Sequence, residues 1–180
     1  MTKSILLVGV GGQGTILASK ILTNSLMEAG YGVKMSEIHG MSQRGGSVSS
    51  QVRYGEKVMS PVIEKGKADI VVSFEKMEAL RALDYLKEDG TLVVNNEEIP
   101  SIMEEIEKHV QAKVVNATGL ARELGNEKAA NIILLGTIIR SMGLEHIDWD
   151  EILKANIKPQ FLELNKKALK VGMDAITCQA

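Results

Sequence analysis

Near its N-terminus the chain reads Ile5-Leu6-Leu7-Val8-Gly9-Val10-Gly11-Gly12-Gln13-Gly14, and this stretch determines the architecture. Residues 5–8 are apolar without alternation, which is typical of a strand buried on both faces in the centre of a parallel sheet. From Thr15 onward, apolar residues recur at steps of three and four until Gly30, which predicts a helix that ends at this glycine. The expected order is strand, glycine-rich turn, helix.

Short apolar runs and helical patterns alternate along the rest of the chain. Strands are predicted at residues 33–38, 48–54, 70–72, 92–94 and 114–115, and helices at residues 76–86, 101–109, from 121 onward and at 128–142. Residues 39–47 are too few for a helical crossover, so we expect the strand at 48–54 to run antiparallel. The expected fold is α/β, a three-layer Rossmann-like sandwich with a mostly parallel, mixed sheet and a helical C-terminal portion.

In the C-terminal portion, residues 128–142 are apolar almost all round, which favours a buried helix. Asp148 followed by Glu151 is a helix-start signature, and Pro159 separates two helices. The inner stripe of the last helix is expected at Phe161, Leu164, Ala168 and Val171. No linker, repeat or low-complexity tract interrupts the sequence, so we expect residues 1–180 to form a single domain.

The composition excludes several classes of function. The 180 residues hold 21 Lys and Arg against 23 Asp and Glu, a net charge of -2, so we expect no nucleic acid or membrane partner. Aromatic residues make up 3%, too few for base-stacking surfaces. The single cysteine, Cys178, cannot build an iron–sulfur cluster, a zinc ribbon or an internal disulfide by itself. The first apolar run is too short for a signal core, so we expect a cytoplasmic protein.

The first glycine loop is a candidate anion site. Residues 9–14 match G-x-G-x-x-G between a strand and a helix, where close backbone approach and free N–H groups favour an anionic group. Thr15 stands where a Walker loop has lysine, so we do not expect a nucleoside triphosphate. Glu37, at the end of the second predicted strand, is the candidate acid for a dinucleotide ribose. Alternatively, the glycines only permit close packing of strand and helix.

A second glycine-rich loop, residues 39–47, should lie at the same sheet edge, so that both loops face one crevice. The predicted cofactor-binding residues of the two loops are Gly9, Gly11, Gly12, Gln13, Gly14, Gly40, Ser42, Arg44, Gly45, Gly46 and Ser47. Arg44 is expected to meet a phosphate or carboxylate, with a surface salt bridge as the alternative. An esterase motif, G-x-S-x-G, fails because Arg44 replaces its last glycine, so we set hydrolase chemistry aside.

The other polar candidates carry less weight. His39 is explained as well by a hydrogen-bonded loop position as by catalysis, and neither His109 nor His146 has carboxylates at metal-ligand spacing. Asn95 ends a predicted strand where ligands bind in such sheets. Asn131 heads the buried helix, where a bond to an adjacent loop is the safer interpretation. We therefore assign no metal site and no catalytic acid or base.

A set of motifs spread over nearly the whole chain carries a family resemblance. They are Gly9-Val10-Gly11-Gly12-Gln13-Gly14, Ser36-Glu37-Ile38-His39-Gly40-Met41-Ser42-Gln43-Arg44-Gly45-Gly46, Ser60-Pro61, Ala68-Asp69, Asn95, residues 131–136, Pro159, Asn165, Ala168 and Gly172. Together they resemble the gamma-type domain of 2-oxoacid:ferredoxin oxidoreductases. The Arg44 loop, at this distance from the first loop, is the specific feature. Length and C-terminal end are most similar to the separate beta subunit of the indolepyruvate type, and a gamma subunit for pyruvate, ketoisovalerate or another 2-oxoacid stays open.

The resemblance implies a subunit of an oxidoreductase that acts on an oxo group with an iron–sulfur protein as acceptor. In that family a 2-oxoacid and coenzyme A give an acyl-CoA, carbon dioxide and two electrons, which reach ferredoxin through iron–sulfur clusters. One cysteine holds no cluster, and the sequence has no G-D-G…N segment for thiamine-bound magnesium. We therefore expect thiamine diphosphate, Mg²⁺ and the clusters on a partner subunit. This chain would help form the coenzyme A and substrate crevice and be inactive alone.

Two other functions stay open at this point. One is an independent NAD(P)- or FAD-binding Rossmann enzyme with Glu37 on the ribose. The other is a pure assembly module whose loops contact protein and no small molecule. Binding of nicotinamide cofactor by the isolated chain, or its purification with a large iron–sulfur subunit, distinguishes these functions from the first.

Overall fold

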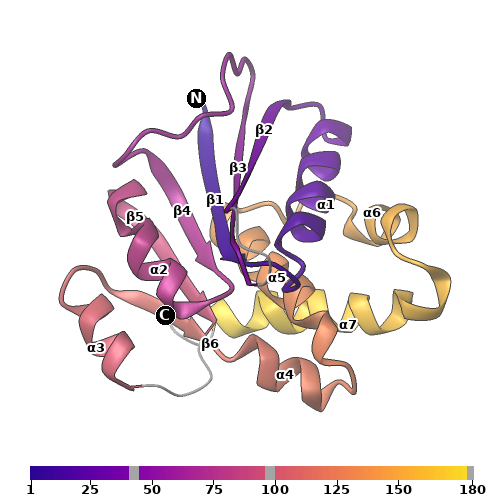
Figure 1. The fold of residues 1–180 in the computed structure, drawn as a ribbon. Coiled ribbons are helices and arrows are strands. Elements are labelled where there is room, and N and C mark those ends of the chain that lie inside the picture. Colours follow the sequence, from indigo (N-terminus) through magenta and orange to yellow (C-terminus); the bar gives the residue numbers. More distant parts are fainter. Residues whose placement is uncertain (41–44, 96–99, 178–180) are drawn as a thin grey trace.

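The computed structural model describes residues 1–40, 45–95 and 100–177 (Figure 1). Ser42 and Arg44 of the predicted binding loops, and Cys178, lie outside the described residues. Strands mixed with helices extend as far as Val115 and only helices follow among the described residues, so the predicted α/β fold is confirmed. Among the described residues, no helix is both long and apolar enough to cross a membrane.

The sheet of the described residues has six strands. They are β1 (Lys3–Val10), β2 (Gly32–His39), β3 (Ser47–Gly55), β4 (Ala68–Ser73), β5 (Leu86–Asn95) and β6 (Ala112–Val115), in the spatial order β2-β3-β1-β4-β5-β6. Strands β1, β4, β5 and β6 are parallel neighbours, whereas β3 runs antiparallel between β2 and β1. The predicted mixed sheet is confirmed, because the short connection after β2 returns the chain as an antiparallel neighbour.

Helices cover both faces of the sheet (Figure 1). They are α1 (Thr15–Glu28), α2 (Lys76–Ala82), α3 (Pro100–Glu107), α4 (Ala117–Glu123), α5 (Ala130–Met142), α6 (Trp149–Asn156) and α7 (Pro159–Thr177), with the 3-10 turns η1 (Leu83–Tyr85) and η2 (Glu127–Ala129). Ile5 and Leu7 of β1 pack in a core with α1 and α4 to α7. Leu6 and Val8 pack on the opposite face with α2 and α3. Strand β1 is therefore buried on both faces, as predicted, and the three layers are confirmed.

Helix α5 is the buried helix that the sequence predicts, since every residue from Asn131 to Ile139 is buried. Helix α7 crosses it at the distance of backbone contact. A Cβ atom at Gly172 would lie 1.9 Å from the carbonyl oxygen of Ile133, and a Cβ at Gly136 would lie 2.3 Å from that of Leu169. Glycine at both positions lets the two backbones touch.

The predicted inner stripe of α7 is partly wrong. Phe161 is 40% exposed, whereas Ala168 is buried and the half-buried Leu164 and Val171 pack against the core, as expected. The buried residues of this helix are Asn165, Ala168, Leu169, Gly172 and Ile176. The crossing at Gly172 turns Asn165, Leu169 and Ile176 toward the interior and leaves Val171 at the margin of the buried face. Phe161 lies about three turns before Gly172 and therefore on the same side of the helix, so its exposure reflects its place in the first turn of α7.

Two helix boundaries also differ from the prediction. Helix α2 ends at Ala82, and Leu86 already begins β5 after the 3-10 turn, so the helix predicted at 76–86 is too long. Helix α4 begins at Ala117 rather than near residue 121, because the Asn116 side chain accepts a hydrogen bond from the Gly119 N–H at 2.8 Å. By contrast, the predicted cap of α6 is present, with Glu151 N–H donating to the Asp148 carboxylate at 3.2 Å.

Candidate functional site

The two glycine loops meet at one edge of the sheet. The Gly11 N–H donates to the Gly46 carbonyl at 2.9 Å, which joins the first loop directly to the second. The Gly40 N–H donates to the Ser47 carbonyl at 2.7 Å and closes the base of the second loop. This edge holds the carboxyl ends of the parallel strands, where open α/β sheets bind their ligands. The predicted meeting of the loops is therefore confirmed.

A hollow of about 420 Å³ lies beside this junction. It is lined by Val10, Gly11, Gly12, Gly14, Thr15, Ile16, Leu17, Lys20 and Val48. Lys20 supplies a positive charge at the surface. Gly14, which precedes α1, offers no side chain to cap it, so the first N–H groups of the helix have no side-chain acceptor. The hollow thus combines a helix N-terminus with a lysine, an arrangement that favours an anionic group.

The hydroxyl of Thr15 adds a polar group at the same place. It is buried and has no hydrogen-bond partner among the described residues. The sequence draws attention to Thr15 only as the residue that replaces a Walker lysine. Its unmet hydrogen-bonding capacity is visible only in the structure.

Each glycine of the first loop has its own explanation. A Cβ at Gly9 would lie 2.9 Å from Phe74 Cβ, and one at Gly14 would lie 2.6 Å from Asn131 Nδ2, so these two permit close packing. Gly12 has a φ of 98°, which favours glycine. A Cβ at Gly11 would meet nothing nearer than the Gly46 carbonyl at 3.9 Å. Packing therefore does not explain Gly11, whose missing side chain keeps the hollow open.

Gln13 supports the first loop from within. Its Oε1 accepts a hydrogen bond from the Val10 N–H at 2.9 Å, and its Nε2 donates to the Phe74 carbonyl at 3.2 Å. Both ends of the amide group are thus engaged by the backbone of the protein. In this structure Gln13 shapes the loop and links it to the end of β4.

Ser47, predicted as a binding residue, uses its hydroxyl inside the protein. Its Oγ donates to Glu78 Oε2 at 2.6 Å, and Glu78 is also paired with Arg81. Glu78 is 4% exposed and lies in the first turn of α2. Sequence reasoning missed Glu78. The available signal was its place in the helix that follows β4, beside the carboxyl ends of the central strands.

Glu37 does not occupy the position that a dinucleotide acid requires. It lies on β2, and the antiparallel β3 separates β2 from β1. Its carboxylate is 3.6 Å from His39 Nε2 on the same strand, and its Oε1 is buried without a hydrogen-bond partner among the described residues. A ribose acid in a Rossmann fold stands on the parallel neighbour of the first strand. The dinucleotide alternative therefore loses its acidic residue.

The side chains of Asn95 and Asn131 form hydrogen bonds with backbone groups of neighbouring segments. Asn95 donates to the Phe74 carbonyl at 3.2 Å, and its Oδ1 accepts the Ala117 N–H at 3.0 Å. Asn131 donates to the Gly14 carbonyl at 3.4 Å, which confirms the interpretation that it bonds an adjacent loop. Within the described residues, no three His, Cys, Asp or Glu side chains converge as a metal ion would require.

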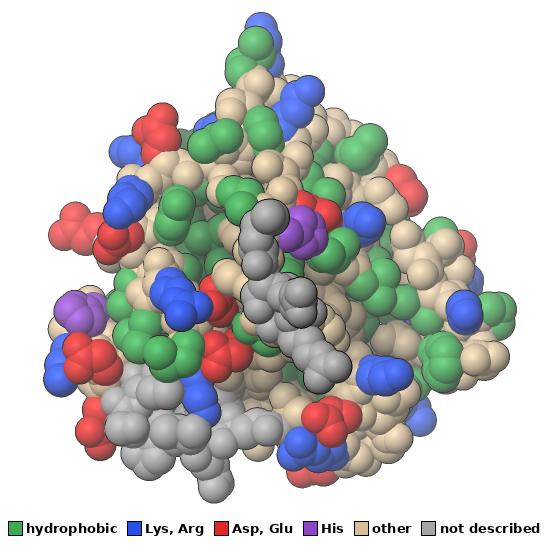
Figure 2. All heavy atoms as spheres, viewed as in Figure 1, with side chains coloured by type: hydrophobic (Ala, Val, Ile, Leu, Met, Phe, Trp, Pro, Cys, Tyr) green, Lys and Arg blue, Asp and Glu red, His purple; other side chains and the backbone are tan. Residues whose placement is uncertain are grey.

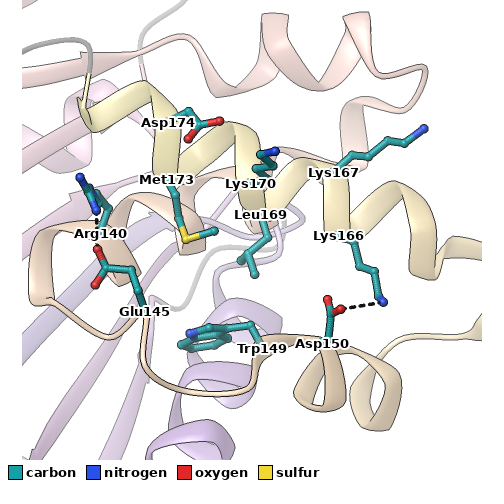
Figure 3. Close-up of a pocket in the computed structure, with 10 residues that line it drawn as sticks. All are labelled: Arg140, Glu145, Trp149, Asp150, Lys166, Lys167, Leu169, Lys170, Met173 and Asp174. Carbon is teal, nitrogen blue, oxygen red and sulfur yellow. Dashed lines mark hydrogen bonds and ion pairs between the residues drawn. The ribbon is translucent and has the colours of Figure 1, made fainter.

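A larger hollow, about 650 Å³, lies between the end of α5, α6 and α7 (Figure 3). Arg140 pairs with Glu145 at 2.8 Å and Lys166 with Asp150 at 3.1 Å, so much of its charge is neutralised locally. The predicted binding residues do not line it. Figure 2 likewise shows acidic and basic side chains interspersed over the face that it presents. The junction of the glycine loops is therefore the stronger candidate site.

Comparison with known proteins supplies the family context. Residues 4–175 match the family model described as pyruvate ferredoxin/flavodoxin oxidoreductase. The indolepyruvate oxidoreductase subunit IorB of Pyrococcus horikoshii is 35% identical, over 96% of this chain and 95% of the relative. The pyruvate oxidoreductase subunit PORC of Thermotoga maritima has a similar structure, with a TM-score of 0.77, 26% identity and 96% of each chain covered.

A 2-oxoglutarate:ferredoxin oxidoreductase from Magnetococcus marinus, solved with 2-oxoglutarate, coenzyme A and succinyl-CoA bound, shares the fold. Its TM-score is 0.82 at 20% identity. The match covers 98% of this chain but 31% of that one. The fold of this chain therefore occurs both as a separate subunit and as part of a longer polypeptide.

Proposed function

Because the chain belongs to the pyruvate ferredoxin/flavodoxin oxidoreductase family, we propose that it is a subunit of a 2-oxoacid:ferredoxin oxidoreductase complex. The complex joins the acyl group of a 2-oxoacid to coenzyme A, releases carbon dioxide and a proton, and passes two electrons to ferredoxin. Similarity to the indolepyruvate oxidoreductase subunit makes indolepyruvate the first 2-oxoacid to test. Pyruvate, ketoisovalerate and 2-oxoglutarate are the next.

The chemistry is divided between subunits in this proposal. A chain with one cysteine in 180 residues does not supply the four thiolates of an iron–sulfur cluster. Thiamine diphosphate, its Mg²⁺ and the clusters then belong to a partner subunit, where thiamine stabilises the carbanion formed on decarboxylation. This chain contributes binding and orientation, and it is inactive alone.

The observation that carries the assignment of a site is the Gly11–Gly46 hydrogen bond, which makes one rim of two loops beside the hollow. Coenzyme A carries phosphate groups, and the N-terminus of α1 together with Lys20 favours such a group. Arg44 is expected to add a guanidinium to this rim, a prediction that rests on the sequence alone. We assign the rim to the coenzyme A side of the crevice.

The residues of this chain act by holding the anionic part of coenzyme A, so that its thiol can reach the partner's thiamine. Gly11 allows the ligand to approach the backbone, because a side chain there would fill the hollow. The N–H groups at the start of α1 bind and orient the anion without a proton transfer. In this proposal the subunit speeds the reaction by positioning coenzyme A, and it takes no part in the bond-making steps.

Two single-lysine variants of the assembled complex test whether coenzyme A binds at the hollow. We expect Lys20→Ala to raise the KM for coenzyme A about two- to five-fold, the worth of an exposed ion pair, with kcat unchanged. The matched control is Lys57→Ala, which removes an exposed lysine beyond the opposite end of β3. Steady-state kinetics with varied coenzyme A give the answer. An equal effect of both substitutions would contradict a site at the hollow.

Ligand titration tests the alternative of an independent NAD(P)- or FAD-binding Rossmann enzyme. Calorimetry of the isolated chain with NAD, NADP and FAD is expected to show no tight binding, because Glu37 is separated from β1 by β3. Tight nicotinamide binding by the isolated chain would overturn the proposal in favour of an independent Rossmann enzyme.

A further inference from the structure

Glu78 is a buried carboxylate beside the candidate site. It is 4% exposed, in the first turn of α2. Burying a charge is costly unless it is paired and hydrogen-bonded. Glu78 has both kinds of partner, since one carboxylate oxygen is paired with Arg81 and the other accepts the Ser47 hydroxyl at 2.6 Å. Both oxygens of this buried carboxylate are therefore bound by side chains, directly beside the glycine-loop junction.

Its partner Ser47 is the point where the second glycine loop enters β3. The Ser47 carbonyl accepts the Gly40 N–H at 2.7 Å, and the preceding carbonyl, that of Gly46, accepts the Gly11 N–H at 2.9 Å. A continuous hydrogen-bonded path therefore runs from the first loop through the second loop to α2. Glu78 is the end of this path that is fixed in a helix, and the next residue, Ala79, belongs to the hydrophobic core.

We propose that Glu78 is a positioning residue that, through Ser47, holds the Gly46 carbonyl in contact with Gly11 and so fixes the described part of the rim that binds coenzyme A. This inference rests on the proposed function of the loop junction. Charge–dipole hydrogen bonds of this length are stronger than neutral ones, so the carboxylate restricts Ser47 more than an amide would. Because Ser47 and Gly46 are consecutive, restricting Ser47 also restricts the carbonyl that holds Gly11.

Arg81 has a separate part in this arrangement. Its side chain is 67% exposed, whereas that of Glu78 is 5% exposed, so the cation sits over the buried carboxylate from the solvent side. An unpaired carboxylate next to an anion-binding rim would repel the ligand. The pair with Arg81 thus lets Glu78 anchor the loop without adding a net negative charge to the rim.

The test uses the assembled complex and a double-mutant cycle. Ser47→Ala and Glu78→Ala are each expected to raise the KM for coenzyme A about five-fold, the worth of one hydrogen bond, with kcat within about two-fold of wild type. The double variant is expected to show no more than the larger single effect, because both substitutions break the same contact. Glu78→Gln keeps an oxygen for Ser47 but not the charge, so its KM for coenzyme A should lie between those of wild type and Glu78→Ala.

Glu105→Ala is the matched control. Glu105 forms the same spacing of carboxylate and cation, an i,i+3 pair with Lys108 at 2.6 Å, on α3 and on an exposed surface. The KM of the Glu105→Ala complex for coenzyme A is expected to equal that of the wild-type complex. If Glu78→Ala does not fold, Ser47→Ala still decides the matter, because it removes only a hydroxyl group.

The outcomes separate this inference from the function on which it rests. A wild-type complex whose 2-oxoacid oxidation is independent of coenzyme A overturns both. A coenzyme A-dependent complex with unchanged KM in Ser47→Ala overturns the positioning role alone, and so do effects of Ser47→Ala and Glu78→Ala that add. A lowered melting temperature with unchanged KM shows that the contact is structural only.

Discussion

Arg44 carries the guanidinium group of the second glycine loop, residues 39–47. We expect Arg44→Ala to lower the kcat/KM of the complex for coenzyme A about ten- to hundred-fold, which corresponds to a charged hydrogen bond of about 1.5–3 kcal/mol. If Arg44 meets only the ligand, the free energy of unfolding of the chain should change by less than about 0.5 kcal/mol. Kinetics of the complex and urea unfolding of the chain measure the two quantities. Matching losses of activity and stability would instead identify a structural salt bridge.

At the scale of single residues, the sequence predicts where the loops lie better than what each residue does. The glycine pattern locates both loops, since its spacing is local. It does not distinguish Gly14, which makes room for Asn131, from Gly11, which keeps the hollow open. Nor does it predict the partnership of Ser47 with Glu78, which are 31 positions apart. Such contacts depend on which strands become neighbours.

Asp69 on β4 connects three adjacent strands. Its carboxylate accepts the Ser4 N–H of β1 at 2.7 Å and contacts Lys3 of β1 at 3.2 Å and Lys87 of β5 at 2.6 Å. Burial raises the pKa of Asp69, but the hydrogen bonds from Lys87, Ser4 and Lys3 outweigh burial and hold this pKa below its usual value. A carboxyl group whose pKa is lower in the folded than in the unfolded chain stabilises the folded chain above the unfolded pKa.

We therefore expect Asp69→Asn to lower the free energy of unfolding at pH 7 by about 1–3 kcal/mol, because charged hydrogen bonds are lost. The difference from wild type should shrink as the pH falls below about 4, since Asp69 is then protonated in the unfolded chain, and it should vanish once the pH falls below the lower pKa of the folded chain. Urea unfolding from pH 7 down to pH 2 measures it. A difference that stays constant over this range would show that the charge of Asp69 does not contribute.

The crossing of α5 and α7 makes a prediction about helix packing. Gly172→Ala places a methyl group where only 1.9 Å separates it from the Ile133 carbonyl, so the helices must move apart. We expect a loss of about 1–3 kcal/mol or more in the free energy of unfolding, as for overpacked cores. Lys167→Ala, on the exposed side of the same helix, is the control. Equal urea midpoints for the two variants would contradict the close crossing.

At the scale of elements, hydrophobic pattern and loop length predict most of the sheet. The unbroken apolar run of residues 5–8 predicts a doubly buried strand, and the short stretch 39–47 predicts an antiparallel neighbour. The rotation of α7 was not predictable in this way. It is fixed by backbone contact at Gly136 and Gly172, and glycine contributes no side chain to an apolar pattern.

For the whole molecule, two hydrophobic cores lie on opposite faces of one sheet, and alternate residues of β1 belong to each. Because neither core is complete without the sheet, we propose that the chain is a single domain. The loops that form the candidate site are attached to the edge of this same sheet. The edge that we propose as the binding site is therefore held by the most deeply buried part of the fold.

The central claim concerns assembly, and purification from the native host tests it most directly. We expect the chain, carrying an affinity tag, to elute with a larger partner that contains iron–sulfur clusters and thiamine diphosphate. The eluted assembly should reduce ferredoxin only when both a 2-oxoacid and coenzyme A are present. A chain that elutes alone, without an iron–sulfur subunit and without this activity, would contradict the account.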